Sequence, residues 1–228
     1  MTYEELTRRI DNSYSLFLAA LLGKYMSAIS PYAEASQSSV SAFVKEAQKI
    51  SANFLQEADK ELKGYLLGLY GDESKIPEPV ERLEIEAEVR LRRAVLENNA
   101  QLHSLLRMKV NNFTKTLQVS GVTRQLVDKK MNQVEFTVRD TIGRKLEAKR
   151  YIHGAIRGFA YQTWITAEVE HLITEGFKLG FVERDKPEEN GLIFSLKGKV
   201  DNYPSLADIW SKVFHPNSNA KVIGYVQP

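Results

Sequence analysis

Histidines and acidic residues are the side chains here with the clearest capacity for metal binding or catalysis. His215 stands in a His215-Pro216-Asn217 run near the C-terminus, and Asp185 and Glu188 precede it. A structural zinc site normally takes four Cys or His ligands, and the chain has no cysteine. We therefore expect no metal, and we predict that His215 is a turn residue, with Pro216 fixing the backbone before a last strand.

Other catalytic arrangements have little support in the sequence. A hydrolase serine in a nucleophile elbow needs Gly-x-Ser-x-Gly, and no such run occurs. His153 and His171 lack the His-x-x-x-His spacing of a zinc protease helix. The acids are scattered along the chain, so no pair stands out for acid–base catalysis. The expectation is a non-enzymatic protein without a cofactor.

Basic residues gather between positions 122 and 160, where nine Lys or Arg accompany four acids. A basic helix face can bind the phosphate backbone of a nucleic acid without reading bases, and salt weakens such binding. The alternative is a solvated helix face, neutralised by pairs four residues apart such as Asp140 with Arg144. Both interpretations stay open. The candidate nucleic-acid contacts are Arg139, Arg144, Lys145, Lys149, Arg150 and Arg157.

Long helices are predicted to position these residues, because apolar side chains recur three and four residues apart over most of the chain. Thr2-x-x-Glu5 predicts a capping box opening a first helix, which ends by Ser30-Pro31. Further helices are predicted over 34–70, stopped by Gly71, and over 78–119. A fourth, containing Leu126, Met131, Val134, Val138, Ile142 and Leu146, leads into a helical pattern from Tyr151 to Trp164. Asn98, within the apolar stripe of the third helix, is expected to face solvent and not to fix a register.

The last third of the chain changes character and becomes rich in turns. A helix is predicted to open at Thr166 and to stop near Gly176 and Gly180. Short strands are predicted at Phe181-Val182 and at Leu192-Ile193-Phe194, with a later β-prone run over 221–226. We therefore expect a mainly α fold with a small α+β C-terminal module. The predicted regions are 1–71, 72–165 and 166–228.

A group of residues in this module resembles a known family. Asp185 in an acidic turn, the Leu196-x-Gly198-Lys199-Val200 segment and His215-Pro216-Asn217 look like the C-terminal module of the phage Mu F-like minor head, or head morphogenesis, proteins. The resemblance covers about the last sixty residues. The family often has a Cys-x-x-Cys pair after the turn, and Cys-Arg-Cys or Cys-Arg-His after His-Pro-Asn. This chain has Ser218, Asn219 and Ala220 at the latter place.

The resemblance implies a structural minor head protein of a tailed phage, which docks on portal or capsid proteins and contacts DNA during packaging or ejection. Its location would be the virion, after assembly in the host cytoplasm, and Asp185, Gly198, His215, Pro216 and Asn217 would shape the module. The alternative is a helical adaptor or nucleic-acid-binding scaffold. Apolar stripes wider than one face suggest an oligomer or a bound partner, and the apolar run 16–22 is too short to span a membrane.

Overall fold

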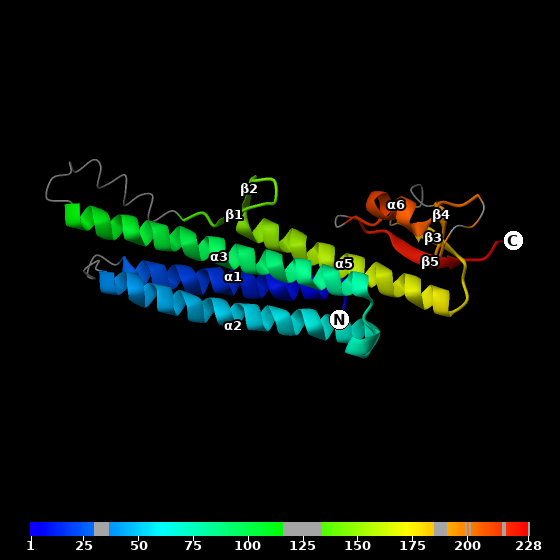
Figure 1. Cartoon of the computed structure of the whole chain (residues 1–228), viewed down its shortest axis with the longest axis horizontal. Helices are drawn as coiled ribbons and strands as arrows, with labels where there is room; N and C mark the ends of the chain where they lie inside the picture. The colour runs from blue at the N-terminus through cyan, green and yellow to red at the C-terminus, as the bar shows by residue number, and fades with distance from the viewer. Residues whose placement is uncertain are drawn as a thin grey trace. The chain divides into compact units, whose positions relative to one another are not determined.

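The fold is mainly α with a small α+β module in its C-terminal part, as predicted (Figure 1). The computed structural model describes residues 1–29, 37–115, 134–184, 191–198, 200, 202–215 and 218–227. Its helices are α1 (Tyr3–Ala28), α2 (Gln37–Tyr70), α3 (Glu78–Lys115), α5 (Ala148–Thr174) and α6 (Leu206–Val213), with a 3₁₀ turn, η1, over Glu73–Lys75. Among the helices within the described ranges, none combines the length and the apolar character that a membrane span requires.

The helix ends follow from local chemistry, and several were predicted correctly. The amide of Thr2 donates to Glu5 Oε2 over 3.0 Å, and the amide of Glu5 donates to Thr2 Oγ1 over 3.2 Å, which completes the capping box of α1. Gly71 ends α2 with a φ of +75°, and its amide donates to the carbonyl of Leu67 over 2.8 Å. The predicted ends over 30–36 and 116–119 lie outside the described residues.

The predicted helix through Val138, Ile142 and Leu146 is wrong, because these residues form a β-hairpin. Strands β1 (Thr137–Arg139) and β2 (Lys145–Glu147) pair antiparallel, with Val138 opposite Leu146. Asp140 Oδ1 accepts the amides of Ile142 and Arg144, and Gly143 adopts a φ of +83° that suits a tight turn. The four-residue spacing of the apolar side chains fits a hairpin as well as a helix. Leu126 and Met131 lie outside the described residues.

Helix α5 runs without interruption through the predicted helix start at Thr166, so that prediction is also wrong. The Thr166 hydroxyl donates to the carbonyl of Gln162 over 2.9 Å, which is a bond of the helix interior and not of a cap. The helix ends at Thr174, and Gly176 follows with a φ of +92°, as expected of a stop signal. Gly180, the second predicted stop, lies instead within a strand.

The C-terminal strands form one antiparallel sheet in the order β4-β3-β5. Its strands are β3 (Leu179–Glu183), β4 (Ile193–Ser195) and β5 (Lys221–Tyr225), close to the predicted runs. Helix α6 between β4 and β5 was not predicted. Ser205 caps it, because its hydroxyl accepts the amide of Asp208 while the Asp208 carboxylate accepts the amide of Ser205. The Ser205-x-x-Asp208 spacing was the signal that could have revealed it.

The chain divides into two compact units, which share several helices. Unit 1 comprises Met1–Thr7, Leu62–Ala87 and Gly154–Pro228, and unit 2 comprises Arg8–Glu61 and Glu88–His153. These segments differ from the predicted regions 1–71, 72–165 and 166–228, since α5 crosses the boundary at 165.

The core of unit 2 is rich in aromatic side chains. Phe54 of α2 lies 5.4 Å from Tyr14 and 5.2 Å from Phe17 of α1, ring centroid to ring centroid. Such pairs add to the apolar area that the helices bury against one another. Leu91, Leu102 and Leu106 are among the buried side chains that α3 contributes to this unit.

Candidate functional site

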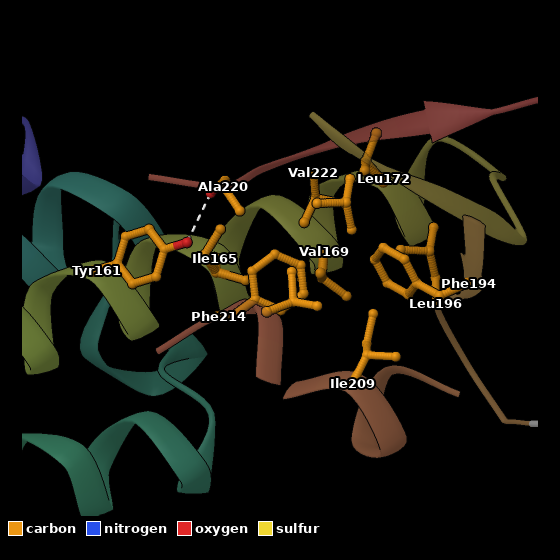
Figure 2. Packing of buried hydrophobic residues seen from close by; sticks show 12 residues of the cluster. Tyr161, Ile165, Val169, Leu172, Phe194, Leu196, Ile209, Phe214, Ala220 and Val222 are labelled. Atoms are coloured by element: carbon orange, nitrogen blue, oxygen red, sulfur yellow. Dashed lines mark hydrogen bonds between the residues drawn. The ribbon is translucent and has the colours of Figure 1, made fainter. Parts of the chain in front are cut away.

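The C-terminal module has a continuous apolar core of its own, built on the second half of α5 (Figure 2). Phe194 of β4 packs edge-on against Phe214, with ring centroids 6.0 Å apart. The Tyr161 hydroxyl donates to the carbonyl of Ala220 over 2.8 Å, which ties the segment before β5 to α5. The other buried members are Ile165, Val169, Leu172, Val182, Leu196, Ile209, Val213 and Val222.

The residues that carry the family resemblance are only partly described. Gly198 lies in a bend with a φ of +71°, a conformation that favours glycine. The His215 side chain is exposed, and its carbonyl accepts the amide of Ser218 over 2.8 Å. Asp185, Pro216 and Asn217 lie outside the described residues. The structural role of this group therefore stays a prediction.

Ser218, which stands where the family has a cysteine, is buried and hydrogen-bonded within the turn. Its hydroxyl accepts the amide of Ala220 over 3.1 Å. A hydroxyl thus satisfies a local backbone donor at this position. Across the described ranges, no group of three or more His, Asp or Glu side chains is arranged to hold a metal ion.

The face of the C-terminal sheet opposite the module core is largely apolar. Leu179 and Ser195 are buried at one end of it, and its other apolar side chains are at least partly accessible. Side chains alternate between the two faces along each strand, and Gly180, Val182, Phe194 and Val222 are on the core side. The opposite face carries a row of registered neighbours, with Phe181 of β3 between Ile193 of β4 and Ile223 of β5. Tyr225 extends this row, since its ring stacks on Phe181 with centroids 6.5 Å apart.

We call Phe181, Ile193, Ile223 and Tyr225 the outer sheet face. Ile223 is exposed and the other three are half-buried. Sequence reasoning assigned these residues to strands or β-prone runs but did not recognise a surface, because the register that aligns them depends on the sheet order. Their alternation with Gly180, Val182 and Val222 was the available signal.

Five of the six predicted nucleic-acid contacts lie on the hairpin and the first turn of α5, all within unit 2. Arg139, Arg144, Lys145, Lys149 and Arg150 are exposed. Arg139 and Lys145 are direct cross-strand partners, a like-charge arrangement that is unfavourable unless an anion lies nearby. The predicted single helix face is therefore wrong, because a hairpin supplies most of these cations. We call the five residues the hairpin cations.

Arg144 and Arg157 have protein contacts of their own. Arg144 Nε lies 2.7 Å from Asp140 Oδ2, so the predicted Asp140–Arg144 pair forms, within the hairpin turn. Desolvation works against ionisation of Asp140, but the hydrogen bonds from Arg144 and Ile142 outweigh it and hold the pKa of Asp140 below its usual value. Arg157 belongs to unit 1, where its guanidinium lies 5.7 Å from the ring centroid of Tyr3.

Helix α3 covers the open edge of the hairpin with two side chains one turn apart. Glu97 Oε2 accepts the amide of Arg139 over 2.8 Å. Gln101 Oε1 accepts the amide of Thr137, and Gln101 Nε2 donates to Thr137 Oγ1 over 2.7 Å. A shallow pocket borders this contact, and its lining includes Arg139, Lys145, Glu97 and Glu135. The hairpin is thus fixed to α3, which holds Arg139 and Lys145 at the rim of the pocket.

Comparison with known proteins gives no further assignment. No protein-family model, curated protein or solved structure matches the chain. The likeness of the last sixty residues or so to the Mu F-like minor head proteins therefore depends on the quoted residues alone.

Proposed function

We propose that this protein is a non-enzymatic structural component of a phage head, located in the virion, which docks on a portal or capsid protein through its C-terminal module. Two features support the proposal. One is the resemblance of the module to the Mu F-like minor head proteins. The other is the outer sheet face, which is the observation that carries the docking role.

An antiparallel sheet with one face on a core usually turns polar residues to the solvent on its other face. The outer sheet face departs from this pattern across three adjacent strands. Ile223 is exposed, while Phe181, Ile193 and Tyr225 stay partly accessible. An apolar row that remains accessible on adjacent strands is a common feature of protein interaction sites. The cross-strand pair of Glu183 with Lys221 lies beside it, so the apolar row has a charged rim as many interfaces do.

The proposal is tested by Ile223→Glu, which places a charge in the middle of β5 on this face. We expect loss of co-purification with portal and capsid proteins and failure to enter particles. The matched control is Ile142→Glu, the same change at an exposed isoleucine of the hairpin. Normal particles containing Ile223→Glu, or infectious heads from a chain truncated after Thr174, would contradict the proposed role.

A second candidate is a nucleic-acid-binding scaffold, which the hairpin cations favour. Four of the five lie within seven consecutive positions, from Arg144 to Arg150. Contact with packaged DNA is compatible with a head protein, whereas DNA binding without particle association would favour the scaffold. Charge reversal at Lys145, Lys149 and Arg150 separates the two, as described in the Discussion.

A further inference from the structure

Helix α3 carries exposed apolar side chains on the side that faces away from its own core. Ile85 is 61% exposed, Val89 58% and Leu96 67%. Together with Arg92, whose side chain is 64% exposed, they follow one another at steps of four, three and four residues. That spacing places all four along one side of a single continuous helix. We call them the α3 stripe.

The opposite side of the same helix is already buried. Ala87, Leu91 and Ala94 are each at most 2% exposed and lie about half a turn away from the stripe. The stripe is therefore a second, exposed side of α3, separate from the side that packs against the core. Its steps of three and four match the a and d positions of a heptad, the pattern that a second helix recognises.

We propose that the α3 stripe is the contact between two copies of this chain, paired antiparallel about a two-fold axis between residues 90 and 91. The argument for a second copy is that the stripe complements itself. In an isologous contact the same patch of both copies meets across a two-fold axis, so the patch must be complementary to itself. In this arrangement Ile85 lies opposite Leu96 of the second copy, and Val89 lies opposite Arg92.

The charges select the antiparallel direction. In a parallel pair each side chain meets its own copy, so Arg92 would face Arg92 within the seam. In the antiparallel pair Arg92 lies beside Glu88 of the second copy, and symmetry makes this contact twice. Glu88 already pairs with Arg92 within the helix, Oε2 to Nη2 over 3.4 Å. Dimer formation would therefore replace an ion pair within one helix by an ion pair between two helices, which is better shielded from solvent.

Sedimentation velocity on the full chain, over a range of concentrations, tests the inference. We expect a dimer for the wild type and an increase of at least about tenfold in Kd for Val89→Glu and for Leu96→Glu. Leu16→Glu is the matched control, because Leu16 on α1 is 71% exposed and lies outside the stripe. Circular dichroism would establish that all three variants keep their helices.

A wild type that stays monomeric, or an equal effect of Leu16→Glu, would overturn the proposal. The orientation has its own test, because the chain has no cysteine and an introduced thiol is unique. Two differently tagged copies, one with Val89→Cys and one with Arg92→Cys, should form a mixed disulfide under mild oxidation, ahead of either self-pair. Preferential Val89 self-pairing would show a parallel contact. Neither result depends on the proposed head function.

Discussion

Asn98 and Tyr14 form a polar contact inside the helical core of unit 2. Asn98 is fully buried, and its Nδ2 donates to the Tyr14 hydroxyl. Burial raises the pKa of Tyr14 far above its usual value, although the Asn98 bond lowers it in part. The expectation that Asn98 faces solvent is therefore wrong. One asparagine in an apolar stripe looks the same in a sequence whether its partner is water or a tyrosine on another helix.

We predict that Tyr14→Phe lowers the free energy of unfolding by about 1–3 kcal/mol, because the buried amide of Asn98 loses its acceptor. Adding Asn98→Leu should recover much of that loss, since an apolar pair leaves no buried donor without a partner. Urea denaturation of the two single variants and the double variant measures the coupling. Strictly additive losses would show that the two side chains do not interact.

Tyr25 gives the stability of unit 2 a defined dependence on pH. Burial raises the pKa of Tyr25 from 10.0 to about 12. Because the folded state holds the proton more tightly than the unfolded state, this contribution is complete below pH 10 and is lost as pH rises towards 12. Tyr25→Phe should show a smaller alkaline loss of stability over this window. If the free energy of unfolding of the wild type and of Tyr25→Phe fell equally with rising pH, Tyr25 would not be the source of this pH dependence.

At the level of elements, the sequence predicted the helix ends and strands that local interactions determine. It missed the elements that depend on contacts with distant parts of the chain. The capping box at Thr2, the stop at Gly71 and the strands around Phe181 and Phe194 were predictable. The hairpin was not, because Val138 and Leu146 are also spaced as in a helix. The turn at Asp140 and Gly143 was the one local signal for a hairpin. The partners on α3 that hold it, Glu97 and Gln101, are distant in sequence.

Gly180, the second residue of β3, lies where a larger side chain does not fit. A Cβ at this position would come within 2.8 Å of Phe194 and 2.9 Å of Leu196, both buried in the module core. We predict that Gly180→Ala destabilises the protein by about 1–3 kcal/mol, the usual range for overpacking. Gly64→Ala is the control, because a Cβ there meets open space in α2 and should stabilise by about 0.5–1 kcal/mol. Thermal unfolding of both variants gives the comparison.

At the scale of the whole molecule, the sequence located the basic region but not its form. Five of the six cations lie on the β1–β2 hairpin and the first turn of α5, whereas Arg157 belongs to unit 1 and its guanidinium lies over the ring of Tyr3. A count of charges along the chain cannot show which cations share a surface, because that depends on which segments pack together. For the same reason the sequence did not show which residues of the outer sheet face are neighbours across strands, or that the α3 stripe is exposed.

Reversal of Lys145, Lys149 and Arg150 to Glu is the test of DNA contact. If the hairpin cations bind phosphates, duplex DNA affinity should fall, and the slope of log K against log salt should shrink by roughly 0.9 for each lost phosphate contact. The control reverses Lys45, Lys49 and Lys60, exposed lysines of α2, with the same change in net charge. Fluorescence anisotropy at several salt concentrations measures both. Equal losses in the two variants would mean that only net charge matters.

The cover that α3 lays over the hairpin also limits how copies of the protein can associate. The outward amides of Thr137 and Arg139, which an incoming strand would need, are already held by Gln101 and Glu97. Neighbouring copies therefore cannot form an intermolecular sheet by pairing a strand with the edge of β1. These two edge amides should exchange slowly with deuterated solvent, and Gln101→Ala with Glu97→Ala should open the hairpin to fibril growth.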